Sequence, residues 1–168
     1  RDFIRHFVVI VDNLDGRKLA TRYLVTKSPE EKFKVRGTEE EDEYLLDASN
    51  AMRYQLYMGF ADKVSDQQLL SIYIRYYPLF QQAYEELGYP DRYFNDRLIE
   101  IIEHLLQSPE IEGEIRLVQP KVYYQFADSN LESLSAGQKL LIRIGKVHAS
   151  NIKFRLRNVR WVLTTMGS

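Results

Sequence analysis

A tyrosine-rich stretch with clustered carboxylates and arginines is the part of this sequence best equipped for recognition or catalysis. Six of the chain's twelve tyrosines lie between Tyr73 and Tyr93, and charged and amide side chains flank the Gly88-Tyr89-Pro90 turn. Tyrosine combines a rigid apolar ring with a polar hydroxyl, which suits a binding surface. The candidate ligand-binding residues are Tyr84, Glu85, Tyr89, Arg92, Tyr93, Asn95, Asp96 and Arg97, with Tyr124 as a further candidate.

This stretch could either bind a ligand or catalyse hydrolysis. Asn95, Asp96 and Arg97 fall near the start of an expected helix, where free backbone N–H groups can bind an anion. A cleft lined by tyrosines at this place could hold a peptide or a sugar. Glu85 and Asp96 could instead act as the acid and base of a hydrolase, provided that they converge in one cleft. Carboxylates at solvated helix ends more often serve in caps and ion pairs, so we favour binding.

No other pattern in the sequence is typical of an enzyme or a metal site. There is no phosphate-binding glycine loop, no GxSxG turn and no HExxH motif. Cysteine is absent, which excludes disulfides, thiol catalysis and cysteine-bound zinc or iron–sulfur clusters. His6, His104 and His148 lie far apart, which favours a structural role for each. The sequence therefore predicts no metal and no cofactor, and it favours a protein without enzymatic activity.

Charge is distributed unevenly along the chain. From Ser133 onward there are seven basic residues and no acidic ones, so the preceding part holds the other 16 of the 23 basic residues and all 24 acidic ones. Arg143, Lys153, Arg157 and Arg160 could form an anion-binding face for nucleic acid or lipid. The more common outcome is that such residues pair with acidic groups of the same chain. A pI near 6.4 argues against a dedicated nucleic-acid binder.

The elements that must position these residues form a mainly helical α+β fold. A chain of 168 residues fits one globular domain, which we place at residues 1–168. Alternating side chains predict a short antiparallel sheet from residues 32–46 and 115–126, with an exposed hairpin loop at 37–43. About six helices are expected. The longer ones cover residues 2–13, 48–63, 66–87, 92–107 and 147–163, and shorter ones follow the caps Asp128 and Ser135.

The helix at 66–87 is expected to be the central element of the domain. Ser65 and Gln68 match a capping box, which defines its start. Its polar positions form one narrow stripe, and such a pattern is typical of a helix surrounded by other elements. Pro78 lies within it and predicts a kink near Ile74. The expected architecture is therefore a set of helices around a kinked central helix.

Three segments of the chain resemble a family of Gram-negative bacterial proteins. They are Tyr77–Leu98, which reads YPLFQQAYEELGYPDRYFNDRL, Val11–Leu14 and Leu134–Lys139. Together they resemble the uncharacterised family called domain of unknown function number three thousand and fourteen, over nearly the whole chain. The resemblance implies a soluble periplasmic domain, joined by a proline-rich linker to one N-terminal helix that anchors it in the inner membrane. It implies no activity, so no catalytic residue is carried over.

These observations lead to one favoured function and two alternatives. We expect a non-enzymatic binding module of the cell envelope that contacts a protein partner or a cell-wall glycan through Tyr84–Arg97 and Tyr124. A hydrolase using Glu85 and Asp96 is one alternative, and an anion-binding module for nucleic acid or lipid is the other. No apolar run approaches the ~20 residues that cross a bilayer. Contact with a membrane is therefore expected only through an N-terminal anchor.

Overall fold

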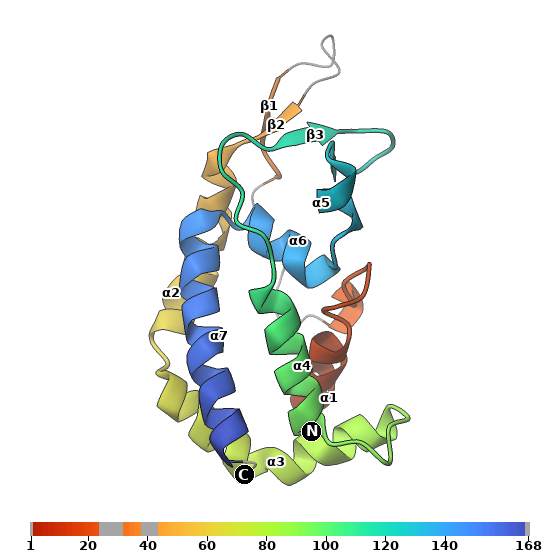
Figure 1. The fold of residues 1–168 in the computed structure, drawn as a ribbon, viewed down its shortest axis with the longest axis vertical. Coiled ribbons are helices and arrows are strands. Elements are labelled where there is room, and N and C mark those ends of the chain that lie inside the picture. Colours follow the sequence, from red (N-terminus) through yellow and green to blue (C-terminus); the bar gives the residue numbers. More distant parts are fainter. Residues whose placement is uncertain (1, 24–31, 38–43, 167–168) are drawn as a thin grey trace.

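The computed structural model describes residues 2–23, 32–37 and 44–166 and confirms the mainly helical α+β class. Figure 1 shows the sheet at one end of the molecule and α3 across the other, with α4 and α7 running between them. The helices of the described part are α1 (Asp2–Asp12), η1 (Thr21–Tyr23), η3 (Ala48–Tyr54), α2 (Gln55–Asp62), α3 (Asp66–Glu86), α4 (Phe94–Leu106), α5 (Ser129–Ser133), α6 (Ala136–Arg143) and α7 (Lys146–Met166), where η marks a 3₁₀ helix.

The strands form one antiparallel sheet in the order β1-β2-β3-β4, which confirms the expected pairing of residues 32–46 with 115–126. They are β1 (Val35–Arg36), β2 (Tyr44–Leu46), β3 (Arg116–Val118) and β4 (Gln125–Phe126). Tyr44 lies opposite Leu117, which lies opposite Phe126, so these three side chains share one face. With Ile142 of α6 they form a small core. Most of the expected hairpin loop, from residue 38 to 43, lies outside the described residues.

Side-chain caps define where several helices begin. Ser65 and Gln68 exchange both hydrogen bonds of a capping box at the start of α3, and Ser135 and Gln138 do the same at α6. Each box satisfies two backbone N–H groups that a helix start leaves open. Asp47 also caps as expected, although the first half of the helix that follows it is the 3₁₀ helix η3.

The main core lies where α1, α3, α4 and the α6–α7 corner meet. Phe94 and Ile101 of α4 are 0 and 2% exposed, and Val8 of α1 is fully buried against them. The ring of Phe80 in α3 lies parallel to that of Phe94, with 6.0 Å between centroids. α4 contacts α1, α3 and α7, and its buried side chains Phe94, Ile101, Ile102 and Leu105 join two core clusters.

The expectation that other elements surround the 66–87 helix is wrong, although α3 contacts α1, α4 and α7. α3 crosses one end of the molecule in Figure 1, and Leu69, Ile72 and Tyr76 are 45, 54 and 42% exposed. Its buried side chains are Leu70, Phe80, Ala83 and Tyr84. Part of the apolar surface of α3 is therefore exposed to solvent. A narrow polar stripe does not show by itself that neighbouring elements cover a helix.

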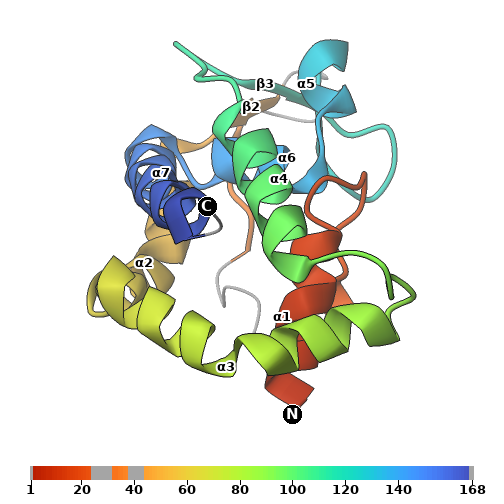
Figure 2. The same cartoon turned by 60° about the horizontal axis from the view of Figure 1, so that its bottom comes forward.

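A bend in α3 agrees with the kink expected at Pro78. Figure 2 shows the helix changing direction part-way along its length. Proline has no N–H, and its ring displaces the carbonyl four residues earlier, which here belongs to Ile74. The bend lets the two halves join different cores. Leu70 packs with Leu163 of α7, whereas Phe80 packs with the residues of α1 and α4.

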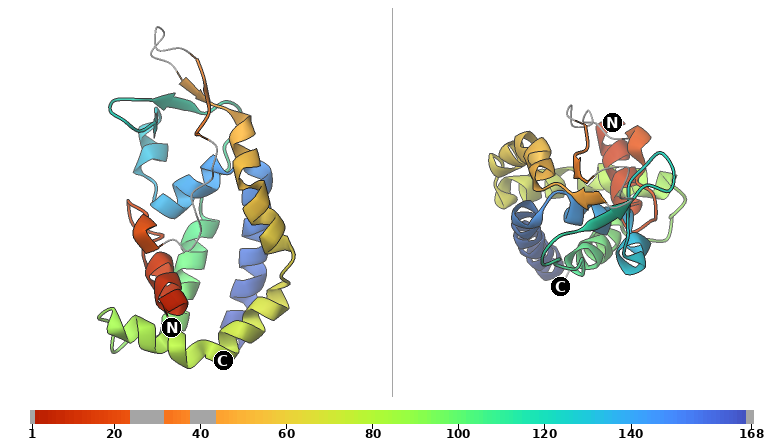
Figure 3. Two further views of the ribbon diagram at one scale, coloured as in Figure 1. Left: turned by 180° about the vertical axis from the view of Figure 1, so that it is seen from behind. Right: turned by 90° about the horizontal axis from the view of Figure 1, so that it is seen from above.

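The last helix lies alongside α4, as Figures 1 and 3 show. Leu163 of α7 is 3% exposed and contacts Ile102 of α4 in a third core cluster. The outer face of α7 carries Phe154 and Trp161, which are 61 and 68% exposed. Across the part of the chain that the structure describes, no helix is both long and apolar enough to cross a membrane.

The start of α6 lies directly against the turn that follows α1. The N–H groups of Ala136 and Gly137 donate to the carbonyls of Gly16 and Leu14, at 2.7 and 2.9 Å. A Cβ atom on Gly137 would lie 2.6 Å from Cδ2 of Leu105 and 2.9 Å from the Leu14 carbonyl oxygen. A residue with a side chain cannot occupy this position without displacing backbone.

The substitution Gly137→Ala is expected to lower the free energy of unfolding by about 1–3 kcal/mol, because the added methyl group overlaps Leu14 and Leu105. Gly59→Ala is the matched control, since no heavy atom lies within 4 Å of its Cβ position in α2. It should raise stability by up to about 1 kcal/mol. Urea unfolding followed by circular dichroism measures both. A Gly137→Ala protein as stable as the wild type would contradict this close contact.

Candidate functional site

Two of the predicted tyrosines support the α3–α4 turn from inside. Tyr84 is 1% exposed, and its ring stacks on that of Tyr89 with 4.6 Å between centroids. The Tyr89 hydroxyl donates to the Asp12 carboxylate at 3.4 Å. Burial raises the pKa of Tyr84, so its hydroxyl stays protonated at neutral pH. These tyrosines fix the turn and leave direct contact with a ligand to their more exposed neighbours.

Arg97 ties the same turn to α1. Its Nε donates to Oδ1 of Asp12 at 2.8 Å, and Nη2 reaches the Asp12 carbonyl oxygen at 2.8 Å and the Asp15 carboxylate at 2.9 Å. Glu100 adds a longer ion pair of 3.4 Å. Burial by itself lowers the pKa of Arg97, but the hydrogen bonds to Asp12 and the charge of Asp15 raise it above its usual range. The donors of Arg97 are therefore directed at α1 rather than at a ligand.

Gln81 bridges α3 and the start of α4, and the sequence had not indicated this role. Its Oε1 accepts the N–H of Phe94 at 2.8 Å, and its Nε2 donates to the Arg92 carbonyl and the Glu85 carboxylate, both at 2.9 Å. The first N–H of α4 is thus occupied, which removes part of the anion-binding capacity expected there. The bridge also holds Glu85 and the backbone of Arg92 in place.

Tyr93 projects between two shallow cavities that together form the candidate binding site. The Tyr93 side chain is 65% exposed. One cavity, of about 350 Å³, lies where α3, the start of α4 and the end of α7 meet, and the other, of about 260 Å³, lies at the α3–α4 turn. Tyr93 and Asp96 line both. We call this pair of cavities the Tyr93 groove. The residues of the larger cavity are Tyr73, Ile74, Tyr77, Tyr93, Asn95, Asp96 and Leu163.

The Tyr93 groove combines protonated hydroxyls with free carboxylates. Burial is the main cause that raises the pKa of both Tyr73 and Tyr77, so these groups donate hydrogen bonds and do not act as bases at neutral pH. The Tyr73 hydroxyl makes a long hydrogen bond of 3.4 Å to the Asn95 side chain. Asp96, and Asp91 in the smaller cavity, form no ion pair with any described residue. The groove therefore suits a cationic group beside an apolar one.

The two carboxylates expected of a hydrolase do not share either of these cavities. Asp96 lines both parts of the Tyr93 groove, whereas Glu85 lines neither and accepts a hydrogen bond from Gln81. The geometry therefore gives no support to paired-carboxylate chemistry at this turn. Among the described residues, no group of three or more His, Asp or Glu could hold a metal ion.

Tyr124 lies apart from the other predicted residues. Its ring contacts those of Tyr44 and Phe33, with 5.1 and 5.8 Å between centroids. It lines a different cavity, of about 630 Å³, which includes Arg143 and no residue of the α3–α4 turn. The Tyr124 carbonyl accepts a hydrogen bond of 3.3 Å from Arg143. The nine predicted residues thus belong to two separate regions.

The basic C-terminal region is largely paired with acidic residues of the same chain. Five of its seven basic residues lie within 4.0 Å of a carboxylate. This intramolecular arrangement is the one that we expected to be more common, and it leaves little of an anion-binding face. The pairs are Lys139–Glu132, Lys146–Glu112, Lys153–Glu110, Arg155–Asp66 and Arg160–Glu103.

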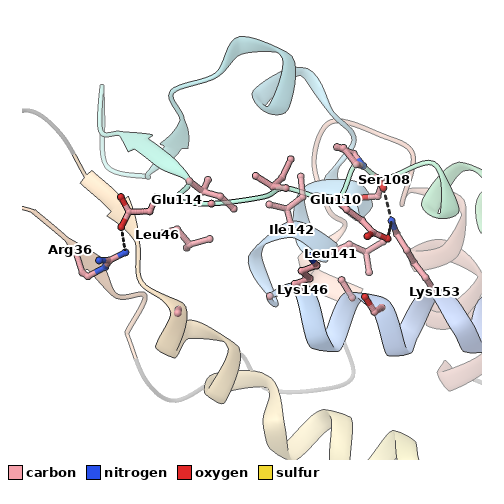
Figure 4. A pocket seen from close by; sticks show the side chains of 17 residues that line it. Arg36, Leu46, Ser108, Glu110, Glu114, Leu141, Ile142, Lys146 and Lys153 are labelled. Atoms are coloured by element: carbon pink, nitrogen blue, oxygen red, sulfur yellow. Dashed lines mark hydrogen bonds and ion pairs between the residues drawn. The ribbon is translucent and has the colours of Figure 1, made fainter.

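A further cavity, of about 230 Å³, lies between the sheet and the α6–α7 corner, and no sequence pattern indicated it (Figure 4). The side chain of Lys153 reaches it from α7 and is 4% exposed. The ion pair between Arg36 and Glu114, at 2.9 Å, lies at the other end. We call it the Lys153 cavity. Its larger apolar lining residues are Leu46, Ile111, Ile115, Leu141 and Ile142.

The fold is a mainly helical α+β domain. In it, the end of α1 and the turn after it contact α4 and the start of α6, which lie far away in the sequence. The chain belongs to the family described as protein of unknown function (DUF3014), which matches residues 3–160. No curated protein and no solved structure matches it.

The three segments that carry the family resemblance meet in the structure. Asp12 binds Arg97, and the Leu14 carbonyl accepts the N–H of Gly137. Val11–Leu14, Tyr77–Leu98 and Leu134–Lys139 are therefore the parts that hold the helices together, whatever else they do.

Replacement of Arg97 by Met should lower the free energy of unfolding by about 2–4 kcal/mol, because Asp12 and Asp15 lose their charged partner while partly buried. Arg157→Met is the control, since Arg157 is exposed and forms no ion pair with the described residues. Its effect should stay within about 0.5 kcal/mol. Chemical denaturation of both variants measures the free energy of unfolding. Equal losses would show that the ion pairs of Arg97 with Asp12 and Asp15 do not stabilise the fold.

The ion pair of Asp66 is expected to make stability depend on pH. Burial raises the pKa of Asp66, but hydrogen bonds from Arg155 and Asn158 outweigh it and hold the pKa below its usual value. A lowered folded-state pKa stabilises the protein above the unfolded-state value, and this contribution disappears as the pH falls through the folded-state value. The stability difference between wild type and Asp66→Asn should therefore be larger at about pH 7 than at about pH 3 in urea unfolding. A difference independent of pH would refute this.

Proposed function

We propose that this protein is a non-enzymatic binding module of the cell envelope that holds a segment of a partner protein in the Tyr93 groove. The observation that carries the proposal is the 65% exposed ring of Tyr93, which stands between two cavities that Asp96 also lines. Exposed aromatic rings often anchor protein partners. A carboxylate beside the ring favours a segment that presents an apolar residue next to Lys or Arg.

The framework around the groove supports binding because it is already fixed. Gln81 holds the backbone of Arg92 and Phe94 on one side, and Arg97 holds the turn to Asp12 on the other. A rigid site loses less conformational entropy when a partner binds. The exposed side chains of Tyr93 and Asp96 can then contact a partner without rearrangement of the α3–α4 turn.

The lining of the groove favours a protein segment over a cell-wall glycan. Ile74 and Leu163 supply aliphatic surface, and the carboxylates of Asp91 and Asp96 attract cations. A neutral sugar would use neither the charge nor the aliphatic surface fully. The location in the cell envelope rests on what the family resemblance implies.

Capture from an envelope extract tests the proposal. Immobilised wild-type domain should recover a partner at least about tenfold better than the Tyr93→Ala/Asp96→Asn double variant, because loss of an aromatic anchor and a charge costs more than about 1.4 kcal/mol. Tyr123→Ala is the matched control. It removes a tyrosine that is 81% exposed and lines a different cavity, so it should capture as the wild type does.

The treatment of the extract separates the possible partners. Protease digestion should abolish capture, and added salt should weaken it, if a cationic protein segment occupies the groove. Loss of capture after digestion of the glycan strands instead would assign the groove to the cell wall. Equal recovery by the wild type and a correctly folded double variant would refute the role of the groove altogether.

A further inference from the structure

From the geometry of the Lys153 cavity we infer a second binding site, which takes a small carboxylate with an apolar body. The Lys153 cavity shares no lining residue with the Tyr93 groove, so this inference does not depend on the proposed function. It rests on a buried cation with spare hydrogen-bonding capacity, on an apolar lining and on the size of the cavity.

The cation is the ammonium group of Lys153. Its Nζ donates to the Ser108 carbonyl oxygen at 2.6 Å, and Figure 4 shows both groups at one end of the cavity. The nearest carboxylate among the described residues belongs to Glu110, at 3.7 Å, which is beyond hydrogen-bonding distance. An ammonium group carries three donors. A charge that is 96% buried with so few acceptors is costly, and a carboxylate in the cavity would supply what is missing.

The other two cations of the cavity lining each lie closer to a carboxylate than Lys153 does. Arg36 pairs with Glu114 at 2.9 Å, and Lys146 pairs with Glu112. The lining contains three cationic side chains, of Arg36, Lys146 and Lys153, and two carboxylates, of Glu110 and Glu114. Glu110 remains as the partner of Lys153, but its exposed carboxylate stays 3.7 Å away, so Lys153 is the cation of this lining that keeps hydrogen-bond donors for a ligand. This arrangement favours an anion over an amine or a neutral molecule.

The rest of the cavity suits the apolar body of the ligand. Leu141 and Ile142 from α6 and Leu46 and Ile115 from the sheet end line its wall. An apolar cavity of about 150 Å³ holds a benzene molecule of six carbon atoms. At about 230 Å³, the Lys153 cavity has room for roughly nine non-hydrogen atoms. A straight-chain carboxylate such as hexanoate fits this size.

Titration of the labelled protein with hexanoate, followed by amide chemical shifts, tests the inference. The shifts should concentrate at residues 108–115 and 141–153, with a dissociation constant on the order of 1 mM. 1-Hexanol should bind at least about tenfold more weakly, because it lacks the charge that Lys153 recognises. Stronger binding of N-acetyl-leucine than of hexanoate would assign the site to the C-terminal carboxylate of a peptide, and weaker binding to a free small acid.

Variants distinguish the contribution of the Lys153 charge from that of the cavity volume. Lys153→Met should weaken hexanoate binding at least tenfold, whereas Arg157→Met, which removes an exposed cation of the same helix outside the cavity lining, should leave it within about twofold. Ser150→Leu keeps Lys153 but fills part of the cavity and should also weaken binding.

The inference is overturned if 1-hexanol binds wild-type protein as tightly as hexanoate, or if the shifts map elsewhere. Unchanged affinity in a folded Lys153→Met protein would overturn it as well. The comparison of hexanoate with 1-hexanol uses the wild type alone, so it decides the matter even if Lys153→Met does not fold.

Discussion

The close contact between the start of α6 and the turn after α1 is the constraint on which the rest of the structure depends. There, carbonyls of the turn that follows α1 accept the first free N–H groups of α6. Gly137 permits this because it has no side chain between Leu14 and Leu105. The contact sets α1 beside α4, which brings Asp12 within reach of Arg97. The α3–α4 turn, and with it Tyr93, is thereby fixed to the core.

Local signals in the sequence were enough to predict most helices and strands of the fold. They did not show which side of α3 other elements cover. The capping boxes at Ser65 and Ser135 and the alternation around Leu117 depend on neighbours in the chain, and each is present in the structure. The position of α3 depends on what packs against it. Leu69 and Tyr76 give the same helical pattern whether another element covers them or solvent does, so the pattern could not show that they are exposed.

The candidate site was predictable to the same extent. Tyr93, Asn95 and Asp96 are close in sequence and lie together in the groove, whereas Tyr124 belongs to another cavity. No rule of spacing distinguishes the buried Lys153 from the exposed Arg157 one turn later. The Lys153 cavity is built from separate segments of the chain, and only their packing gives that lysine a ligand-sized space.

The link between Asp12 and Arg97 also bears on how the domain folds. The two residues are 85 positions apart, so their contact forms only when a long stretch of chain closes on itself. Until it forms, the apolar face of α1, with Val8 and Val11, lacks the part of its cover that α4 supplies. Such non-local closure slows folding and prolongs exposure to other chains. While the domain folds, α1 is therefore a short amphipathic helix whose apolar face can contact other chains.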